Sequence, residues 1–314
     1  MPDTTGHGVP TPPLRVGMIG LGDIAQKAYL PVLTARPDVE LHLLTRDRAK
    51  LDRIGDAYRI PHRYTDIDAL LDAGVGAAFV HAATSAHRPL VERLLDAGRH
   101  VYVDKPLDAC YEGAERLVRL AQRRRRSLMV GFNRRYAPDY AALRTLPRDL
   151  IVMEKHRADL PASPRSVVFD DFIHVVDTLR FLAPGPIQHT QVLVRVHDGL
   201  LHHVVLELAG DGFTALGVMH RLSGAAEEHL HVMGSGGGRR VIDLAEVVRY
   251  GNGDRAGMTV TRRGDWTPVA RQRGIEQICA AFLDAVHSGS LLSAEDTLAT
   301  HAICEQIVTK AHGR

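Results

Sequence analysis

The segment FDDFIHVVDTLRFL, residues 169–182, carries three side chains that could move protons. Asp170 and His174 are four residues apart and Asp177 follows three later, so a helix would place all three on one face. A carboxylate beside a buried imidazole orients and tunes a proton-transfer group. Two alternatives stay open, a capping aspartate with a hydrogen-bonded core histidine and a metal site. Because no further ligand cluster accompanies the trio, we predict no metal.

A second candidate is Lys105 in the tripeptide DKP, which follows the strand expected at residues 100–103. The proline disfavours a helical conformation at Lys105 and so holds it extended at the strand end. Lys105 is then either a catalytic hydrogen-bond donor or a solvated charge. Farther along, Lys155 and Arg157 alternate with His156 and share one strand face. That basic face suits an anionic or polyhydroxy substrate, or is a solvated strand end.

Residues 16–33, VGMIGLGDIAQKAYLPVL, contain the elements that would position these groups: an apolar strand, a glycine turn and a helix start. Gly20, Gly22 and Ala25 have the G-x-G-x-x-A spacing of a dinucleotide-binding turn. Gly20 can adopt positive φ, Gly22 admits a pyrophosphate, and Ala25 lets the helix pack closely. The alternative is an ordinary glycine-rich turn in another α/β protein.

The end of the second expected strand, residues 40–45, bears on the choice of cofactor. An NAD-binding domain usually has an acidic residue there, which accepts hydrogen bonds from the ribose. Here Thr45 and Arg46 occupy that place, and a guanidinium can hold a 2′-phosphate. We therefore favour NADP(H) over NAD(H). Two alternatives are a solvent-exposed Arg46 without a ligand and an Asp47 that restores NAD binding if the loop bends.

The strand expected at residues 76–81 ends in small residues, among them Ala83 and Thr84. Ligands of doubly wound sheets lie at the carboxyl ends of such strands, so we expect this segment in the cofactor crevice. Thr84 could equally be only a helix N-cap.

The alternation of strands and helices predicts an α/β fold with a Rossmann-like, doubly wound parallel sheet over residues 14–131, after a disordered tail at 1–13. Residues 132–314 are expected to form an α+β substrate and oligomerisation domain with an open, mostly antiparallel sheet. Strands are expected between 188 and 242, with hairpins at 210–212 and 234–238, and helices at 275–287 and 294–311.

Composition narrows the function classes. The chain has 314 residues, 45% of them hydrophobic, and a net charge of +2, so no strongly charged partner is implied. Its four arginines at 123–126 are expected to end a helix, where cations suit the helix dipole, and we predict no nucleic-acid partner. The three cysteines are widely spaced, and the chain has neither a signal-peptide pattern nor a membrane-length apolar run. We expect a cytoplasmic enzyme with no membrane partner.

From about residue 14 to its last expected helix, the chain resembles the Gfo/Idh/MocA oxidoreductase family. The resemblance rests on GLGDIA at 20–25, ATSAH at 83–87, DKP at 104–106 and the spacing of Asp170, His174 and Asp177. The phrases VDKPL, MVGFNRRYAP and DDFIHVVD are similar to the virulence-factor MviM-like branch. One departure is Asp104, where the family usually has glutamate, and we expect only a small adjustment of Lys105.

The resemblance implies a nicotinamide cofactor in the first domain and hydride transfer between nicotinamide C4 and a CH–OH or C=O carbon of a small sugar-like or cyclitol-like substrate. It implies His174 as general acid/base, Lys105 as the donor that polarises the substrate oxygen, and Asp170 as the residue that orients substrate or histidine. The reverse roles of Lys105 and His174 stay open. The cofactor-binding residues expected from the turn, the motifs and the resemblance are Gly20, Gly22, Asp23, Ile24, Ala25, Thr45, Arg46, Ala83, Thr84, His87, Asp104, Lys105, Asn133 and Arg135.

Two other functions compete with this hypothesis. A reductase of imines or enones needs the same cofactor geometry and a proton donor. A non-catalytic dinucleotide-binding sensor would keep the fold, but it would have little need of Lys105, Asp170 and His174 together. By analogy with the family, we expect a homodimer or homotetramer.

Overall fold

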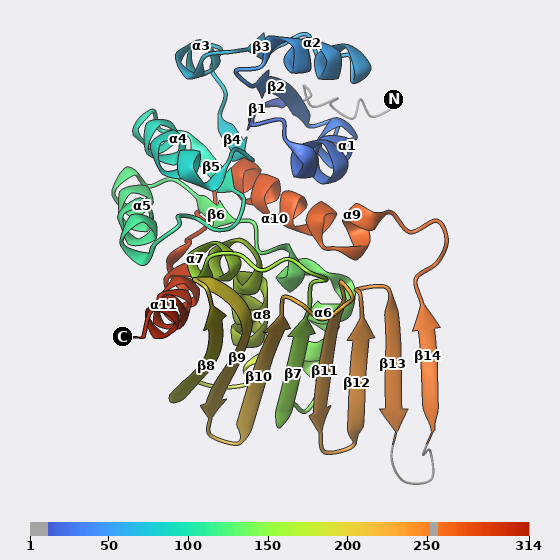
Figure 1. Ribbon diagram of the computed structural model, residues 1–314. Coiled ribbons are helices and arrows are strands. Elements are labelled where there is room, and N and C mark those ends of the chain that lie inside the picture. The colour runs from blue at the N-terminus through green and yellow to red at the C-terminus, as the bar shows by residue number, and fades with distance from the viewer. Residues whose placement is uncertain (1–11, 252–256, 314) are drawn as a thin grey trace, which may run out of the picture.

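The computed structural model describes residues 12–251 and 257–313, and the tail expected at 1–13 lies almost wholly outside this range. Two sheets dominate it (Figure 1), a six-stranded sheet built from the first part of the chain and an eight-stranded sheet built from the second. The expected combination of a Rossmann-like sheet with an open sheet is confirmed. The site lies where the two meet.

The first sheet is parallel throughout and has the order β3-β2-β1-β4-β5-β6. Because the order reverses between β1 and β4, their carboxyl ends leave a crevice. Its strands are β1 (Leu14–Ile19), β2 (Val39–Leu44), β3 (Arg63–Tyr64), β4 (Ala77–Val80), β5 (His100–Val103) and β6 (Leu128–Val130).

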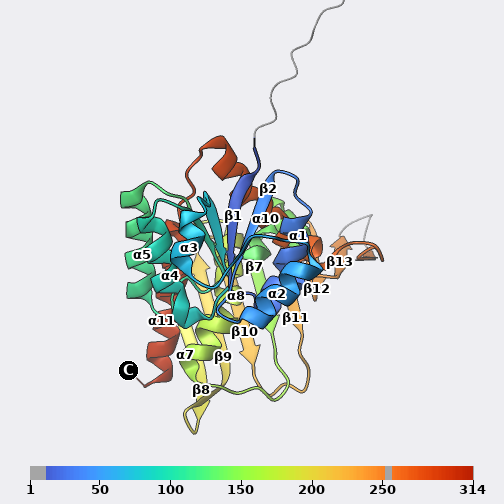
Figure 2. The same cartoon turned by 90° about the horizontal axis from the view of Figure 1, so that it is seen from above.

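Helices cover both faces of this sheet (Figure 2). One face packs against α3 (Ile67–Asp72), α4 (Thr84–Asp96) and α5 (Tyr111–Arg124). The other packs against a π-helical turn (Ala25–Tyr29), α1 (Leu30–Thr34) and α2 (Arg48–Ala57). The strands are therefore buried on both faces, which explains their continuous apolar sequence.

The second sheet has the order β14-β13-β12-β11-β7-β10-β9-β8 and is antiparallel except for the β7–β10 pair. Its strands are β7 (Leu150–Lys155), β8 (His189–His197), β9 (Leu200–Gly210), β10 (Phe213–His220), β11 (Glu228–Gly234), β12 (Gly237–Ile242), β13 (Glu246–Gly251) and β14 (Met258–Arg262). Both expected hairpins form, one between β9 and β10 and one between β11 and β12.

Short helical segments surround β7, namely the 3-10 turns Asn133–Tyr136 and Ala142–Thr145, α6 (Pro138–Ala141), α7 (Pro164–Val167), a π-helical turn (Val168–Phe172) and α8 (Ile173–Leu182). The chain ends with α9 (Val269–Gln272), α10 (Ile275–Ser288) and α11 (Glu295–Ala311). Helix α8 packs on β7 and β10, and α11 packs on α8, α5 and β8. One face of the second sheet is thereby covered.

Helix α10 lies in the first domain although the sequence placed it in the second. Its apolar face, with Ile278, Phe282 and Leu283, completes the core beside β1 and β4 (Figure 1). The Phe282 and Phe79 rings meet edge-on with centroids 5.2 Å apart. An amphipathic pattern shows that a helix has a buried face but not which sheet buries it. The chain thus leaves the first domain after residue 131 and returns to it with α10.

Candidate active site

A pocket of about 690 Å³ lies at the carboxyl edge of the first sheet. Five expected cofactor residues line it, namely Gly20, Gly22, Thr45, Arg46 and Ala83, the last of which is the N-cap of α4. Lys50 of α2 lines it as well and was missed by the sequence reasoning. None of the described residues that line this pocket is acidic.

The glycine turn shows why its two glycines are needed. Gly20 has φ of 87°, and a Cβ there would lie 2.6 Å from the backbone nitrogen of Ala82. Gly22 instead faces open space, because no described atom lies within 4 Å of a Cβ built on it. Gly20 therefore lets two strand ends approach each other, whereas Gly22 leaves room for a ligand.

The side chains that follow β2 carry no negative charge toward this pocket. Arg46 is exposed and Thr45 is half-buried. Asp47, which could have restored ribose binding, instead caps α2 by accepting a hydrogen bond of 2.9 Å from the Lys50 backbone N–H. The part of the pocket next to β2 and α2 is therefore lined by two cations, Arg46 and Lys50.

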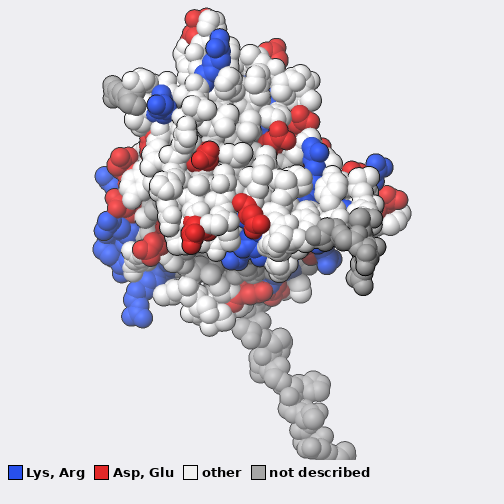
Figure 3. Space-filling model, turned by 90° about the horizontal axis from the view of Figure 1, so that it is seen from below, with Lys and Arg blue, Asp and Glu red and all other residues white. Residues whose placement is uncertain are grey.

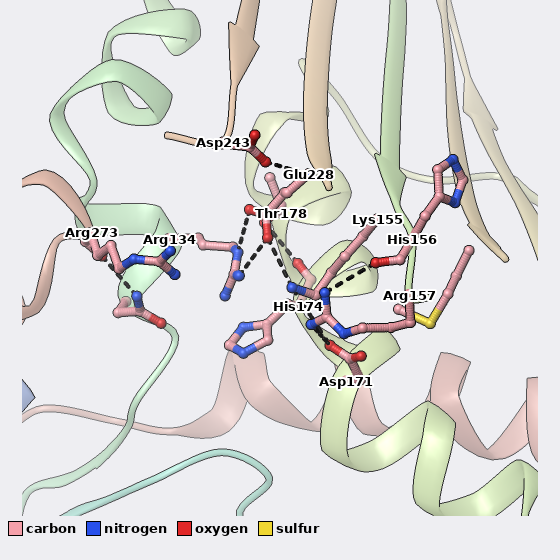
Figure 4. Close-up of polar contacts among 12 residues, drawn as sticks. Arg134, Lys155, His156, Arg157, Asp171, His174, Thr178, Glu228, Asp243 and Arg273 are labelled. Carbon is pink, nitrogen blue, oxygen red and sulfur yellow. Dashed lines mark hydrogen bonds and ion pairs between the residues drawn. The ribbon is translucent and has the colours of Figure 1, made fainter. Parts of the chain in front are cut away.

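A second pocket of about 590 Å³ lies between the domains. It joins Ile24, Asp104, Lys105 and Asn133 to the strand and helix that carry Lys155 and His174. Figure 4 labels the last two residues. Within the described residues the two pockets share no lining side chain. They adjoin at His81 and Asp104, whose Nδ1 and Oδ2 atoms are 3.7 Å apart.

Lys105 reaches into the second pocket, as its place after β5 predicted. Its ammonium donates a hydrogen bond to the backbone carbonyl of Asp170. Burial lowers the pKa of Lys105, while Asp104 and Asp171 counteract that effect. Burial opposes ionisation of Asp104 too, but its contact with His81 and the charge of Lys105 prevail and lower its pKa. Lys105 is held as a donor across the domain junction.

His174 is the imidazole in this pocket. Burial lowers its pKa well below the ordinary value, and the positive charges around it act in the same direction. Those charges belong to Arg134, Lys105, Lys155 and Arg157. His174 is consequently neutral at neutral pH and suited to accept a proton.

The helical face expected for Asp170, His174 and Asp177 does not form. A π-helical turn at 168–172 precedes α8 and changes the phase of the helix. The Asp170 carboxylate accepts hydrogen bonds from Ser166, at 2.9 Å, and Thr84, at 3.4 Å. Asp170 thus contacts Lys105 through its backbone carbonyl, and no hydrogen bond joins its carboxylate to His174.

Asp177 and Arg135 pair with each other outside this pocket. The Arg135 guanidinium donates to both carboxylate oxygens of Asp177, at 2.8 and 2.6 Å, and to Asp296 of α11. Its neighbour Arg134 lines the pocket instead. Asn133 also lines it and donates a hydrogen bond of 2.7 Å to the Arg273 carbonyl. A 3-10 turn separates adjacent arginines in this way, which the sequence did not indicate.

Two carboxylates that the sequence reasoning missed, one buried (Glu228) and one half-buried (Asp171), organise the basic side of the pocket. Glu228 accepts two hydrogen bonds from Arg134, at 2.7 and 2.6 Å, and one of 2.9 Å from Lys155 (Figure 4). Asp171 accepts from Arg157 at 2.8 Å and from Arg221 at 2.7 Å. Lys155 and Arg157 share the pocket face, as alternation along the strand predicted.

The remaining expected residues surround the pockets. His87 is buried behind the wall, where its ring nitrogens lie 2.7 and 3.0 Å from the carbonyl oxygens of Pro106 and Ala82. Asp23 is exposed and pairs with Lys27 at 2.8 Å. Ala25 is fully buried beneath the turn. His87 therefore holds the backbone next to Lys105 in place rather than facing either pocket.

Two family descriptions match the sequence. Residues 14–132 match an oxidoreductase family with an NAD-binding Rossmann fold, and residues 138–250 match the C-terminal domain of YceM-like proteins. The YceM protein of Salmonella typhimurium is 37% identical over 304 residues, which cover 95% of this chain and 96% of that protein. This chain belongs to the Gfo/Idh/MocA family of oxidoreductases.

Two dehydrogenases resemble the chain over most of its length. The dehydrogenase MviM from Clostridium difficile has a TM-score of 0.89 and 31% identity, covering 95% of this chain and 99% of that one. Inositol 2-dehydrogenase of Rhizobium meliloti is 24% identical over 322 residues, covering 94% of this chain and 96% of that protein. The expected family is confirmed.

The glycine-turn pocket fits the dinucleotide that the Gfo/Idh/MocA family implies. The open space at Gly22 admits a pyrophosphate, and the acid-free lining tolerates its charge.

Among the described residues, none of the helices has the length and apolar character needed to span a membrane. The face seen in Figure 3 carries charges of both signs among uncharged residues.

One cluster of side chains that could bind a metal ion lies outside the site, whereas the sequence analysis predicted no metal site. Glu40, His42 and His62 bring their ligand atoms within 4.8 Å of one another at β2. The two imidazoles stack with ring centroids 4.3 Å apart, and Arg15 approaches the Glu40 carboxylate to 3.3 Å. Parallel stacked rings do not direct their lone pairs to one point, and the carboxylate already has cationic and imidazole partners.

Proposed function

We propose that this protein is an NAD(P)-dependent dehydrogenase or reductase, with NADP(H) favoured, that acts on a CH–OH or C=O carbon of a small sugar-like or cyclitol-like molecule. The proposal rests mainly on Lys105 and His174, which two different domains bring into one pocket beside the cofactor crevice. The inositol dehydrogenase among the relatives supports a cyclitol-like substrate.

The protonation states suggest how the two residues divide the work. When bound, a nicotinamide ring accepts or supplies the hydride. In alcohol oxidation, the neutral imidazole of His174 takes the hydroxyl proton while the Lys105 ammonium stabilises the negative charge that develops on that oxygen. In reduction, Lys105 polarises the carbonyl oxygen, and the Lys105–His174 pair donates the proton that this oxygen gains.

Asp170 acts in this scheme through its backbone. Its carbonyl accepts the Lys105 hydrogen bond and fixes the ammonium, while Thr84 and Ser166 hold its carboxylate. We therefore assign Asp170 as a positioning residue for Lys105. Precise placement of a donor matters because small displacements of a catalytic group cost large factors in rate.

The favoured cofactor follows from the charges at the ribose end. Arg46 and Lys50 line that end and none of the described lining residues is acidic, while Asp47 is engaged as a helix cap and its carboxylate lies 3.9 Å from the Lys50 ammonium. A 2′-phosphate would gain charge-assisted hydrogen bonds there, whereas NAD(H) would lack its usual carboxylate partner.

Calorimetric titration of the purified protein with NADPH and with NADH tests the proposal. We expect NADPH to bind more tightly, and the better cofactor then to support turnover in a screen of aldoses, cyclitols and imines. If neither NADPH nor NADH binds, the proposal is contradicted. Turnover of imines alone would identify the imine reductase alternative, and binding without any turnover the sensor. A cytoplasmic location and homodimeric or homotetrameric assembly stay predictions of the sequence.

A further inference from the structure

The pocket that holds His174 has more positive than negative side chains. Seven cationic residues line it, and only three acidic residues do so. The cations are Lys27, Lys105, Arg134, Lys155, Arg157, Arg221 and Arg273, and the acids are Asp104, Asp170 and Asp171. Two further carboxylates pair with cations of this set. Glu228 binds Arg134 behind the pocket wall, and Asp23 binds Lys27 at the pocket rim. The balance still favours positive charge by two.

The excess arises because two carboxylates are each shared among several cations. Asp171 lies 3.5 Å from the Lys155 ammonium, 2.8 Å from the Arg157 guanidinium and 2.7 Å from that of Arg221. Glu228 in turn serves Arg134 and Lys155. These two acids therefore balance only half of the charge on the four cations that they hold.

The bound guanidinium groups still have N–H donors to offer. Glu228 takes Nε and Nη2 of Arg134, and the described residues provide no acceptor for its Nη1. Arg157 uses Nη1 and Nη2 but not Nε, and Arg221 uses Nε and Nη1 but not Nη2. Because a guanidinium keeps its charge and its fixed donor geometry, such spare N–H groups suit an oxyanion.

We propose that the substrate of this pocket is an anion, carrying a carboxylate or phosphate group that Arg157, Arg134 and Arg221 bind while its reacting carbon lies beside Lys105 and His174. This inference rests on the proposed dehydrogenase function and narrows its substrate class. The anion would supply the negative charge that the pocket lacks and use the spare donors.

The cofactor does not account for the same charge. The glycine turn and Arg46 belong to the other pocket, which shares none of the described lining residues with this one. A developing alkoxide accounts for the charge of Lys105, but Arg157 and Arg221 follow the ends of β7 and β10, and both pair with Asp171. A charge held there serves binding and orientation of the substrate.

Calorimetric titration with matched acid and polyol pairs tests the inference. Galactarate and galactitol share one carbon chain and differ in their terminal carboxylates, and glycerol 3-phosphate and glycerol differ in the phosphate. Each is titrated into the protein with and without NADPH. We expect at least one anion to bind about tenfold or more tightly than its neutral counterpart, and the pair that does so distinguishes carboxylate from phosphate recognition.

Variants assign this preference to the pocket. Arg157→Gln should reduce the ratio of anion to polyol affinity about tenfold, and Arg157→Lys should retain part of it. Arg195→Gln, which removes an exposed arginine of β8, should leave the ratio unchanged. The melting temperature of each variant shows that it is folded.

The outcomes separate this inference from the proposed function. Equal affinity for anions and polyols, no anion binding in the millimolar range, or a preference that survives Arg157→Gln would each overturn the anionic substrate, even if NADPH binds and neutral polyols are oxidised. Failure of both NADPH and NADH to bind would overturn the dehydrogenase, while Arg157-dependent binding of an anion would still support the anion site.

Discussion

The two pockets of this protein are built by different means. The glycine-turn pocket, where we propose that the cofactor binds, is formed by the ends of β1, β2 and β4 and by residues of α2, α3 and α4, with glycines and alanines beside apolar and basic side chains in its lining. The second pocket is formed by charged side chains that come from both domains and from segments more than a hundred residues apart. A site made of backbone needs only local sequence rules, whereas a site made of buried charges needs partners from elsewhere in the chain.

The cost of that second design is visible behind the pocket wall. Glu228, Arg134 and Lys155 are all at least nine-tenths buried, and Tyr140 donates a further hydrogen bond of 3.0 Å to Glu228. Burial of such ions costs several kcal/mol per group unless every charge is paired. The network therefore orients Arg134 and Lys155 toward the pocket at a cost that the cofactor pocket does not incur.

The largest effect is expected from substitution of Glu228, which lies at the centre of this network. Glu228→Gln keeps the side-chain shape but leaves Arg134 and Lys155 with an unbalanced charge, so the free energy of unfolding should fall by about 3–5 kcal/mol. Urea unfolding measures it. Glu227→Gln, the same change at the neighbouring and more exposed residue, should alter stability by less than about 0.5 kcal/mol.

The pH dependence of that difference has a defined sign. Arg134 and Lys155 outweigh the burial of Glu228 and hold its pKa below the ordinary value. Its stabilising effect is therefore complete above the ordinary glutamate pKa and is lost as the pH falls below it. A gap between wild type and Glu228→Gln that stayed constant into acid would contradict the assignment.

Removal of the imidazole should affect rate rather than stability. His174→Ala is expected to lower kcat about a hundredfold or more and to leave cofactor affinity nearly unchanged, because His174 lines only the second pocket. His156→Ala, one residue beyond Lys155 on β7 and absent from the pocket lining, is the control. Steady-state kinetics together with cofactor titration check both variants, and a fully active His174→Ala would remove this residue from the mechanism.

The two glycines of the turn should respond differently to the same change. Gly20→Ala forces a Cβ against the Ala82 backbone at positive φ, so stability should fall by about 1–3 kcal/mol whether or not cofactor is present. Gly22→Ala meets open space, so the melting temperature should stay constant while cofactor affinity falls about tenfold. Unchanged cofactor affinity in Gly22→Ala would show that no ligand approaches this turn.

The ribose end offers a milder test. Arg46→Asp, with Thr45 retained, should weaken NADPH binding about tenfold more than NADH binding, because it replaces a donor for the 2′-phosphate with a repelling charge. Arg48→Asp makes the same change on α2, at a residue that pairs with Asp52 and does not line the pocket. Equal effects on both cofactors would contradict the 2′-phosphate assignment.

The smallest effect concerns the charge of Lys155. Burial, with Arg134 next, lowers its pKa to about 8, against the opposing charges of Glu228 and Asp171. As pH rises through that value the ammonium loses its proton, so galactarate or glycerol 3-phosphate should bind about two- to fivefold more weakly. Lys155→Arg stays charged and should bind them independently of pH over this range.

The first domain was largely predictable because its signals are local. The strand, turn and helix around Gly20 and Gly22 and the place of Lys105 after β5 all follow from short stretches of sequence. Hydrophobic periodicity predicted α10 as a helix as well. It did not indicate that α10 would return to the first sheet, since any apolar surface of suitable shape could bury that face.

In the second domain the sequence identified the chemistry and missed its arrangement. Residue spacing predicted that Asp170 and Asp177 would flank His174, but the π-helical turn at 168–172 changed the helical phase. The family resemblance predicted Arg135 near the cofactor, whereas Asp177 of α8 binds that guanidinium and Arg134 faces the pocket. Neither outcome has a signature in a window of a few residues.

The sequence by itself therefore determined the nucleotide-binding fold and the glycine turn, and it predicted as catalytic the two residues, Lys105 and His174, that the structure places in one pocket. Only the tertiary structure decided which charges accompany them. Glu228 and Asp171 acquire their importance from cations that lie 14 to 94 residues away along the chain. The physical reason is that backbone conformation is governed by neighbouring residues, whereas a buried charge is stable only beside partners that the whole fold supplies.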